Sequence, residues 1–188
     1  MRSTGLYVTS GVILKRIKVG EADRILTVFT KEYGKIRVIA KGVRRIYSRR
    51  SPHVELFRNV RLSLNRGKTM DSVSEAEGMD DVTGNTTIRG IGHAYFVCEL
   101  VDRLLPESLE HRDVYALLVD MLRNIRTADS QYDLAAETDK FALVLLRILG
   151  YLPKEKELPH DEIVRFIEEI IERKLKSPAI LTRLDRQE

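Results

Sequence analysis

The spacing of the apolar residues changes once along this 188-residue chain, and the change restricts the folds that the chain can adopt. Before about Gly78 the apolar residues alternate with polar ones or form short runs, which is typical of β-strands. After about Asn85 they recur every three or four positions, which is the spacing of amphipathic helices. The sequence therefore predicts an α+β protein with a β domain over residues 1–80 and an all-α domain over residues 81–188.

Five short strands are predicted in the β domain, separated by turns that contain glycine and charged residues. Their ranges are Val8–Ile17, Arg24–Thr30, Lys35–Lys41, Val54–Asn65 and Lys68–Ala76. So many strands in so short a segment favour a small closed or partly open barrel, because a sandwich needs more strands.

Four helices are predicted in the second domain, from apolar stripes over residues 94–105, 114–125, 134–149 and 163–171. Pro106 ends the first helix and Gly150 closes the third. A residue near His160–Asp161 is expected to cap the fourth. The four stripes together predict a bundle with one shared core.

Charge is divided unevenly between the two parts of the chain. Residues 1–70 contain 17 Lys and Arg against 4 Asp and Glu, a balance of +13. Residues 71–188 contain 15 against 24, a balance of −9. A division this steep indicates two regions with different partners, and the basic region is expected to face a polyanion.

The densest basic segment runs from Lys41 to Arg50 and contains five cations in ten residues. Phosphates relieve the repulsion among such cations, and each neutralised phosphate releases a counterion. We predict a loop whose arginines face solvent and contact phosphates, with Tyr47 as a ring on which a base can stack.

Alternation extends this basic surface onto the third and fourth strands, because successive side chains of a strand point to opposite faces. Ile36, Val38 and Ala40 face the core, so Lys35, Arg37 and Lys41 are expected on the outer face. The predicted nucleic-acid-binding residues are Lys35, Arg37, Lys41, Arg44, Arg45, Tyr47, Arg49 and Arg50, with Arg61, Arg66 and Lys68 as outer contacts.

Side chains with catalytic or metal-binding chemistry are few. The histidines lie at His53, His93, His111 and His160, without the spacing of metal ligands, and the single cysteine, Cys98, lies on an apolar stripe. No apolar run approaches the ~20 residues that span a bilayer. We therefore expect no enzyme, no metal or other cofactor, no small-molecule substrate, no membrane association, and a reducing cytosol as the compartment.

Three segments of the chain carry a family resemblance. They are Gly20–Thr30 with Tyr33–Lys35 and Ala40–Arg45, then Glu99–Pro106, then Leu145–Pro153. In this order the segments resemble the bacterial RecO family of DNA repair proteins, and the first of them is the most specific.

The resemblance implies an OB-fold barrel followed by a helical domain, in a recombination mediator that binds single- and double-stranded DNA and anneals complementary strands. It also implies action with RecR and single-strand-binding protein in loading RecA, in the bacterial cytoplasm at the nucleoid. Many relatives carry a four-cysteine zinc site after the third segment. Here that place holds Lys154–Pro159 without cysteine, and the chain is shorter than usual, so a short form without zinc is expected.

Two other functions fit the residues alone. The charge pattern does not distinguish DNA from RNA, so an RNA-binding OB-fold module is one alternative. The other is a protein-interaction adaptor that binds no nucleic acid and whose acidic helical domain docks a partner. Comparable affinity for single-stranded DNA and RNA would favour the first alternative, and absence of any nucleic-acid affinity would favour the second.

Overall fold

The structure is a computed structural model that describes residues 5–79, 87–128 and 133–184. These residues form two compact units. One comprises the strands together with Pro106–Tyr115, and the other comprises the remaining helical residues. The predicted domain boundary between residues 80 and 81 lies outside the described residues and stays a prediction.

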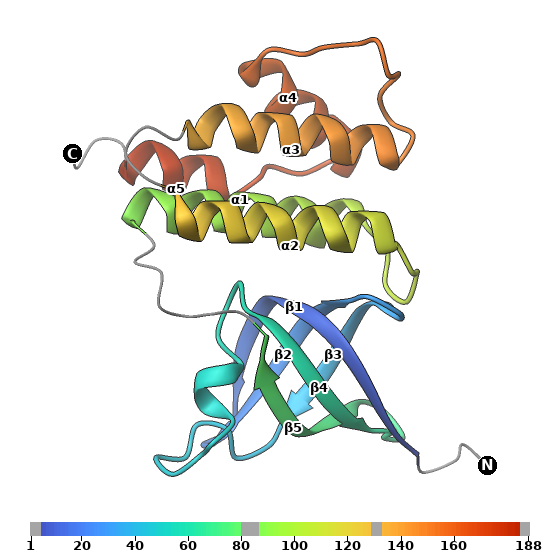
Figure 1. Cartoon of the computed structure of the whole chain (residues 1–188), viewed down its shortest axis with the longest axis vertical. Helices are drawn as coiled ribbons and strands as arrows, with labels where there is room; N and C mark the ends of the chain where they lie inside the picture. Colours follow the sequence, from blue (N-terminus) through green and yellow to red (C-terminus); the bar gives the residue numbers. More distant parts are fainter. Residues whose placement is uncertain (1–4, 80–86, 129–132, 185–188) are drawn as a thin grey trace. The chain divides into compact units, whose positions relative to one another are not determined.

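The five strands close into a barrel (Figure 1). They are β1 (Leu6–Val19), β2 (Asp23–Thr30), β3 (Gly34–Ala40), β4 (Asn59–Asn65) and β5 (Asp71–Gly78). Their order around the barrel is β1-β2-β3-β5-β4, with β3 and β5 parallel and the other pairs antiparallel. This closed five-stranded arrangement is the OB-fold, so the predicted barrel is confirmed.

The barrel core contains the inward-facing apolar residues of all five strands. They are Ile13, Leu26, Val28, Val38, Ala40, Val60, Leu62, Leu64 and Val73. Two further core residues, Val43 and Val54, come from the long connection between β3 and β4. Val54 was predicted within the fourth strand, but that strand begins at Asn59 and Val54 reaches the core from the loop.

The segment Pro106–Tyr115 belongs to the barrel unit although it follows the first helix in sequence. The Ser108 amide donates to the carbonyl oxygen of Lys35 at 3.0 Å. The Tyr115 hydroxyl donates to Oδ1 of Asn59 at 2.8 Å, and both side chains are buried. These contacts cover part of the outer surface of the barrel.

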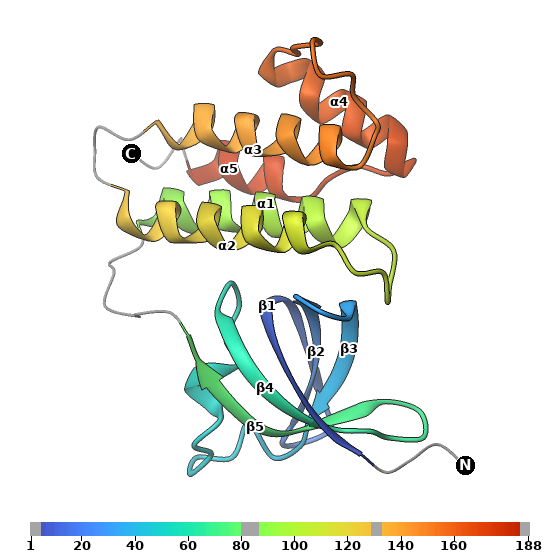
Figure 2. The same cartoon turned by 45° about the vertical axis from the view of Figure 1, so that its right-hand side comes forward.

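The helices are α1 (Ile88–Leu104), α2 (Arg112–Thr127), α3 (Leu134–Ile148), α4 (His160–Ile171) and α5 (Ser177–Leu184). Within the helical unit α1 packs against α3, α4 and α5, and α3 packs against α4 (Figure 2). The expectation that a residue near His160–Asp161 caps the fourth helix is wrong. Pro159 is the N-cap of α4, and no side chain makes a capping hydrogen bond there.

Helix α5 was not predicted, because its eight residues are too few for a clear apolar stripe. Its start is fixed by a distant side chain. The Glu99 carboxylate of α1 accepts hydrogen bonds from the Ser177 amide at 2.8 Å and from the Ser177 hydroxyl at 2.7 Å. The Lys176 amide donates to the same carboxylate at 3.0 Å.

Candidate nucleic-acid interface

The connection from β3 toward the short 3-10 helix η1 (Ser51–His53) is here called the arginine loop and comprises Lys41–Arg50. It is a succession of tight turns. The Arg45 amide donates to the Gly42 carbonyl at 3.2 Å, and the Ser48 amide donates to the Arg45 carbonyl at 3.0 Å. Gly42 has a φ of +66°, a left-handed conformation that glycine adopts without strain.

The beginning of the arginine loop is fixed to the turn between β1 and β2. The Gly42 amide donates to Oδ1 of Asp23 at 2.7 Å. The Arg44 amide donates to the carbonyl of Ala22 at 2.9 Å, and the Arg44 guanidinium donates to the carbonyl of Gly20 at 3.1 Å. Arg44 is therefore half-buried and holds two loops together.

The end of the arginine loop is fixed by Arg50. Its guanidinium donates to the carbonyl of Val73 on β5 at 2.6 Å and to the carbonyl of Lys41 at 2.8 Å. The expectation that all four arginines of the loop face solvent is therefore wrong for Arg44 and Arg50. Both donate to backbone carbonyls, which a sequence pattern does not reveal.

The remaining side chains of the arginine loop point outward. Lys41, Arg45 and Arg49 are exposed, and Ile46 and Tyr47 are each 94% exposed. Neither Arg45 nor Arg49 makes a side-chain hydrogen bond or ion pair with the part of the chain that the structure describes. A cavity of about 510 Å³ is lined by Lys41, Gly42, Arg45, Tyr47, Ser48 and Arg50.

The outer face of β3 differs from the predicted row of three cations. Arg37 and Lys41 are exposed, but Lys35 is only 7% exposed. Lys35 lies beneath the segment Pro106–Tyr115, with a bridge to Glu107 and the hydrogen bond from Ser108. The expectation that Lys35 presents its charge to solvent is therefore wrong.

The predicted outer contacts, Arg61, Arg66 and Lys68, are all exposed on β4 and in the turn that follows it. The Arg66 guanidinium lies 5.0 Å from the centre of the Tyr7 ring, which is within cation–π range. The Tyr7 hydroxyl donates to Oδ2 of Asp71 at 2.6 Å. Burial raises the pKa of Tyr7, and the hydrogen bond to Asp71 raises it further, so the ring stays neutral beside Arg66.

A second group of arginines, on β1 and β2, was missed by the sequence reasoning. Arg16 and Arg24 both pair with the carboxylate of Glu55, and Arg24 does so at 2.9 Å. Burial lowers the pKa of Arg24, and the nearby charges of Arg16 and Arg44 lower it further. One carboxylate is thus shared by two guanidinium groups, with a third guanidinium, that of Arg44, acting on Arg24, and this leaves excess positive charge beside the arginine loop.

The sequence contained part of the information needed to predict this second group of arginines. Lys15, Arg16 and Lys18 are exposed and precede the Gly20 turn, so a basic hairpin could have been predicted from them. Its position next to Arg44 depends on contacts between residues distant in sequence, such as the hydrogen bond from Arg44 to Gly20, which are 24 positions apart. Those contacts do not follow from local spacing.

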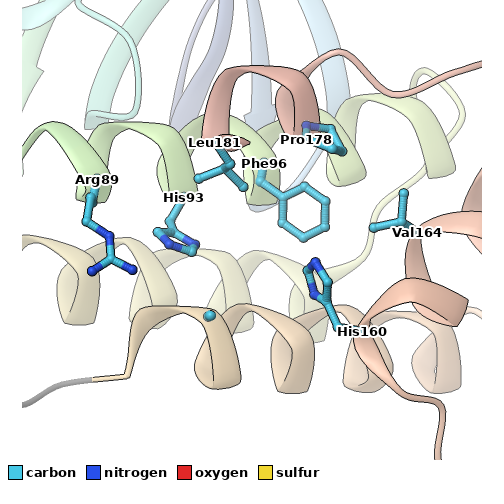
Figure 3. A pocket seen from close by; sticks show the side chains of 8 residues that line it. Arg89, His93, Phe96, His160, Val164, Pro178 and Leu181 are labelled. Carbon is cyan, nitrogen blue, oxygen red and sulfur yellow. The ribbon is translucent and has the colours of Figure 1, made fainter. Parts of the chain in front are cut away.

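The helical unit contains a separate cavity of about 150 Å³ (Figure 3). It is lined by Arg89, His93, Phe96, Ala135, His160, Val164, Pro178 and Leu181. His93 is buried, with Nδ1 3.2 Å from the hydroxyl of Thr138, and His160 Nδ1 lies 2.7 Å from Oδ1 of Asp139. Each imidazole thus has a structural partner, and the apolar lining comes from Phe96, Ala135, Val164, Pro178 and Leu181.

Two classes of site are absent from the described residues, which are 5–79, 87–128 and 133–184. Within these ranges no three His, Cys, Asp or Glu side chains are grouped so that they could hold a metal ion. In the same ranges no helix has the length and apolar character needed to cross a bilayer. The expectation that zinc is absent stays a prediction.

Fold and surface together define a class, an OB-fold barrel with a cationic loop that is followed in sequence by a helical domain. Two family models match this chain. The model of the recombination protein O N-terminal region matches residues 1–81, and the model of its C-terminal region matches residues 85–157. Together the two models account for most of the chain.

Curated relatives agree with both family models. The DNA repair protein RecO of Roseiflexus sp. is 36% identical over 150 residues, which cover 79% of this chain and 52% of the relative. RecO of Pelotomaculum thermopropionicum is 33% identical over 82% of this chain and 59% of the relative. RecO of Bifidobacterium adolescentis is 35% identical over 79% and 61% respectively.

The chain belongs to the RecO family, whose relatives are named as DNA repair proteins. It spans about half to three fifths of the length of the curated relatives described above. The family predicted from the three sequence segments is therefore confirmed.

Proposed function

We propose that this chain binds single- and double-stranded DNA through the arginine loop and the β1–β2 hairpin, and that it anneals complementary strands during recombinational repair. The main support is the set of exposed cations held on a braced loop. Arg45 and Arg49 are solvent-facing, while Arg44 and Arg50 fix the loop by bonds to backbone carbonyls. A rigid loop presents its charges without a large cost in conformational entropy.

Annealing needs no bond-making residue. Two DNA strands repel each other through their phosphates, and a cationic surface that binds both lowers this repulsion and releases counterions. The excess positive charge around Glu55 would add to that of the arginine loop. Because phosphates carry no sequence information, we expect binding to be similar across DNA sequences.

The proposed partners are those that the family resemblance implies. We propose that the chain acts with RecR and single-strand-binding protein to assist the loading of RecA, at the bacterial nucleoid and without enzymatic activity of its own. The names of the relatives, which refer to DNA repair, support a role in that process. The barrel would supply the DNA contact.

The test replaces the two exposed arginines of the loop in the variant R45A/R49A. For single strands each lost phosphate contact lowers the slope of log affinity against log salt by about 0.7, so we expect a decrease of about 1.4. Fluorescence anisotropy of a labelled oligodeoxythymidine over a salt series measures the slope. We also expect slower annealing of two labelled complementary strands, followed by energy transfer between the labels.

A matched control removes the same charge from the helical unit. The variant R165A/R173A replaces two exposed arginines there and should leave the salt slope and the annealing rate unchanged. Thermal melting establishes that both variants are folded. A folded R45A/R49A protein with an unchanged slope would exclude the arginine loop as the DNA site, and equal affinity for RNA would favour the RNA-binding alternative.

A further inference from the structure

Two large apolar side chains occupy the tip of the arginine loop. Ile46 and Tyr47 are the central residues of a turn that is closed by the 3.0 Å hydrogen bond from the Ser48 amide to the Arg45 carbonyl. Central turn positions favour Gly, Pro, Asn, Asp and Ser, and isoleucine prefers strands. Departures from such local preferences concentrate at functional sites.

The tip is held away from the barrel by the bonds that brace the loop. Val43 anchors one side by filling the core, and the side chains of Arg44 and Arg50 bond to backbone carbonyls of β1–β2 and β5. Ile46 and Tyr47 remain 94% exposed in this arrangement. Apolar side chains held in water in this way gain free energy when a partner covers them.

We propose that Ile46 and Tyr47 contact the bases of single-stranded DNA, with the Tyr47 ring stacked on one base and Ile46 packed against its neighbour. The proposal rests on the proposed function and deepens it, because phosphate contacts alone do not distinguish a strand with bases from one without. The proposal assigns two roles to different residues of the arginine loop, namely binding of the phosphates and binding of the bases. Arg45 and Lys41 bind the backbone, and the tip binds the bases.

The cavity beside the tip supports this separation. It has a volume of about 510 Å³ and brings Lys41, Arg45 and Arg50 to the same hollow as Tyr47. A phosphate in the hollow would lie beside the ring, which is the arrangement that a nucleotide requires. Aromatic rings stack on every base, because every base has a π-face.

The charge around the tip selects the partner. No acidic residue occurs between Glu32 and Glu55, and five cations lie in Lys41–Arg50. An apolar surface enclosed by positive charge fits a polyanion with apolar faces, which describes single-stranded nucleic acid. An uncharged protein surface would leave these cations without counter-charges.

The decisive experiment combines removal of the tip with removal of the bases. Wild-type protein and the variant I46A/Y47A are titrated against a labelled oligodeoxythymidine and against an abasic strand of equal length. We expect wild-type protein to bind the strand with bases roughly 5- to 100-fold more tightly than the abasic strand. The I46A/Y47A variant should bind both strands equally, with the salt slope of the wild type.

A conservative variant reports the contact directly. The chain contains no tryptophan, so Tyr47→Trp introduces a single tryptophan that can be excited separately from the tyrosines, and it keeps an aromatic ring. Its emission should be quenched by saturating oligodeoxythymidine and not by the abasic strand. Tyr151→Trp is the matched control, because Tyr151 is 44% exposed in the helical unit, and its emission should not change.

Several outcomes would overturn the inference while leaving the proposed function intact. One is equal affinity of wild-type protein for both strands, and another is a base preference that survives in I46A/Y47A. A third is tip-dependent binding to phosphatidylglycerol vesicles without any difference between the two strands. Failure of wild-type protein to bind either strand would instead contradict the proposed function itself.

Discussion

Arginine side chains hold several loops of the barrel unit, whereas carboxylates hold several loops of the helical unit. In the barrel, arginines donate to backbone carbonyls, as Arg50 does to Val73 and as Arg58 does to Pro52 at 2.9 Å. In the helical unit, carboxylates accept from backbone amides. Glu99 accepts from Ser177, and Glu168 accepts from Leu175 at 3.0 Å.

The surplus charge of each unit supplies these contacts but is not the only source of such bonds, because Asp23 accepts from the Gly42 amide in the barrel and Arg147 donates to the Lys156 carbonyl in the helical unit. Residues 1–70 have the surplus of cations and residues 71–188 the surplus of carboxylates. Net charge therefore predicts which polarity is available in each region. Net charge does not predict which charged side chains bond to the backbone and which remain available to bind a partner.

The comparison depends on assigning Pro106–Tyr115 to the barrel, and Gly34→Ala tests that assignment with the largest expected effect. Gly34 has a φ of +64°, and an added Cβ would overlap the carbonyl oxygen of Leu109. Left-handed strain and overpacking together should lower the free energy of unfolding by about 2–5 kcal/mol. Urea unfolding measures this change.

The control is Gly20→Ala, at a φ of +54° with open space around the added atom. Gly20→Ala should lower the free energy of unfolding by only about 1–2 kcal/mol, which is the cost of the left-handed strain. Displacement of Pro106–Tyr115 in G34A should also increase acetylation of Lys35, measured by mass spectrometry. If G34A cost no more than G20A and left Lys35 protected, this segment would not belong to the barrel.

The second prediction concerns the arginines that brace the barrel, and its expected effect is smaller. Arg50→Ala removes two charge-assisted hydrogen bonds to carbonyls and should lower the free energy of unfolding by about 1.5–3 kcal/mol. Arg49→Ala, at the adjacent exposed position, should stay within about 0.5 kcal/mol of the wild type. Equal melting temperatures for the two variants would show that Arg50 is not a brace.

The sequence was sufficient for features that depend on neighbouring residues. Alternation in segments such as Lys35–Lys41 predicted strands, and the change of spacing after Gly78 predicted the helical domain. The barrel and the family are confirmed. The DNA-binding residues stay a prediction, now without a solvent-facing Lys35 and with Arg44 and Arg50 as braces.

The features that could not be predicted from the sequence depend on contacts between residues far apart in the chain. Arg50 bonds to Val73, which is 23 positions away, and Glu99 fixes Ser177, which is 78 positions away. The composition of the chain does not distinguish Arg49 from Arg50, because both are arginines. Only the three-dimensional structure shows that Arg50 donates to backbone carbonyls and that Arg49 is exposed.

The smallest expected effect concerns a carboxylate that braces the helical unit, Glu168. Lys174 donates to Oε2 of Glu168 at 2.5 Å, and this hydrogen bond lowers the pKa of Glu168 below its ordinary value of 4.5. The Leu175 amide lowers the pKa of Glu168 further. Lys174→Ala should therefore raise the pKa of Glu168, which a carbon-detected NMR titration measures.

The sign of the stability change follows from linkage. A carboxyl group whose pKa is lowered by folding stabilises the folded state above its ordinary pKa, and this contribution disappears as the pH falls through the lowered value. The melting temperature of K174A should thus be slightly below that of the wild type near neutral pH, and the difference should vanish as the pH falls through the lowered pKa of Glu168. Because Lys174 is largely exposed, the difference should also shrink with added salt. A difference that persists at low pH would mean that Lys174 acts through packing and that Glu168 is held by the Leu175 amide alone.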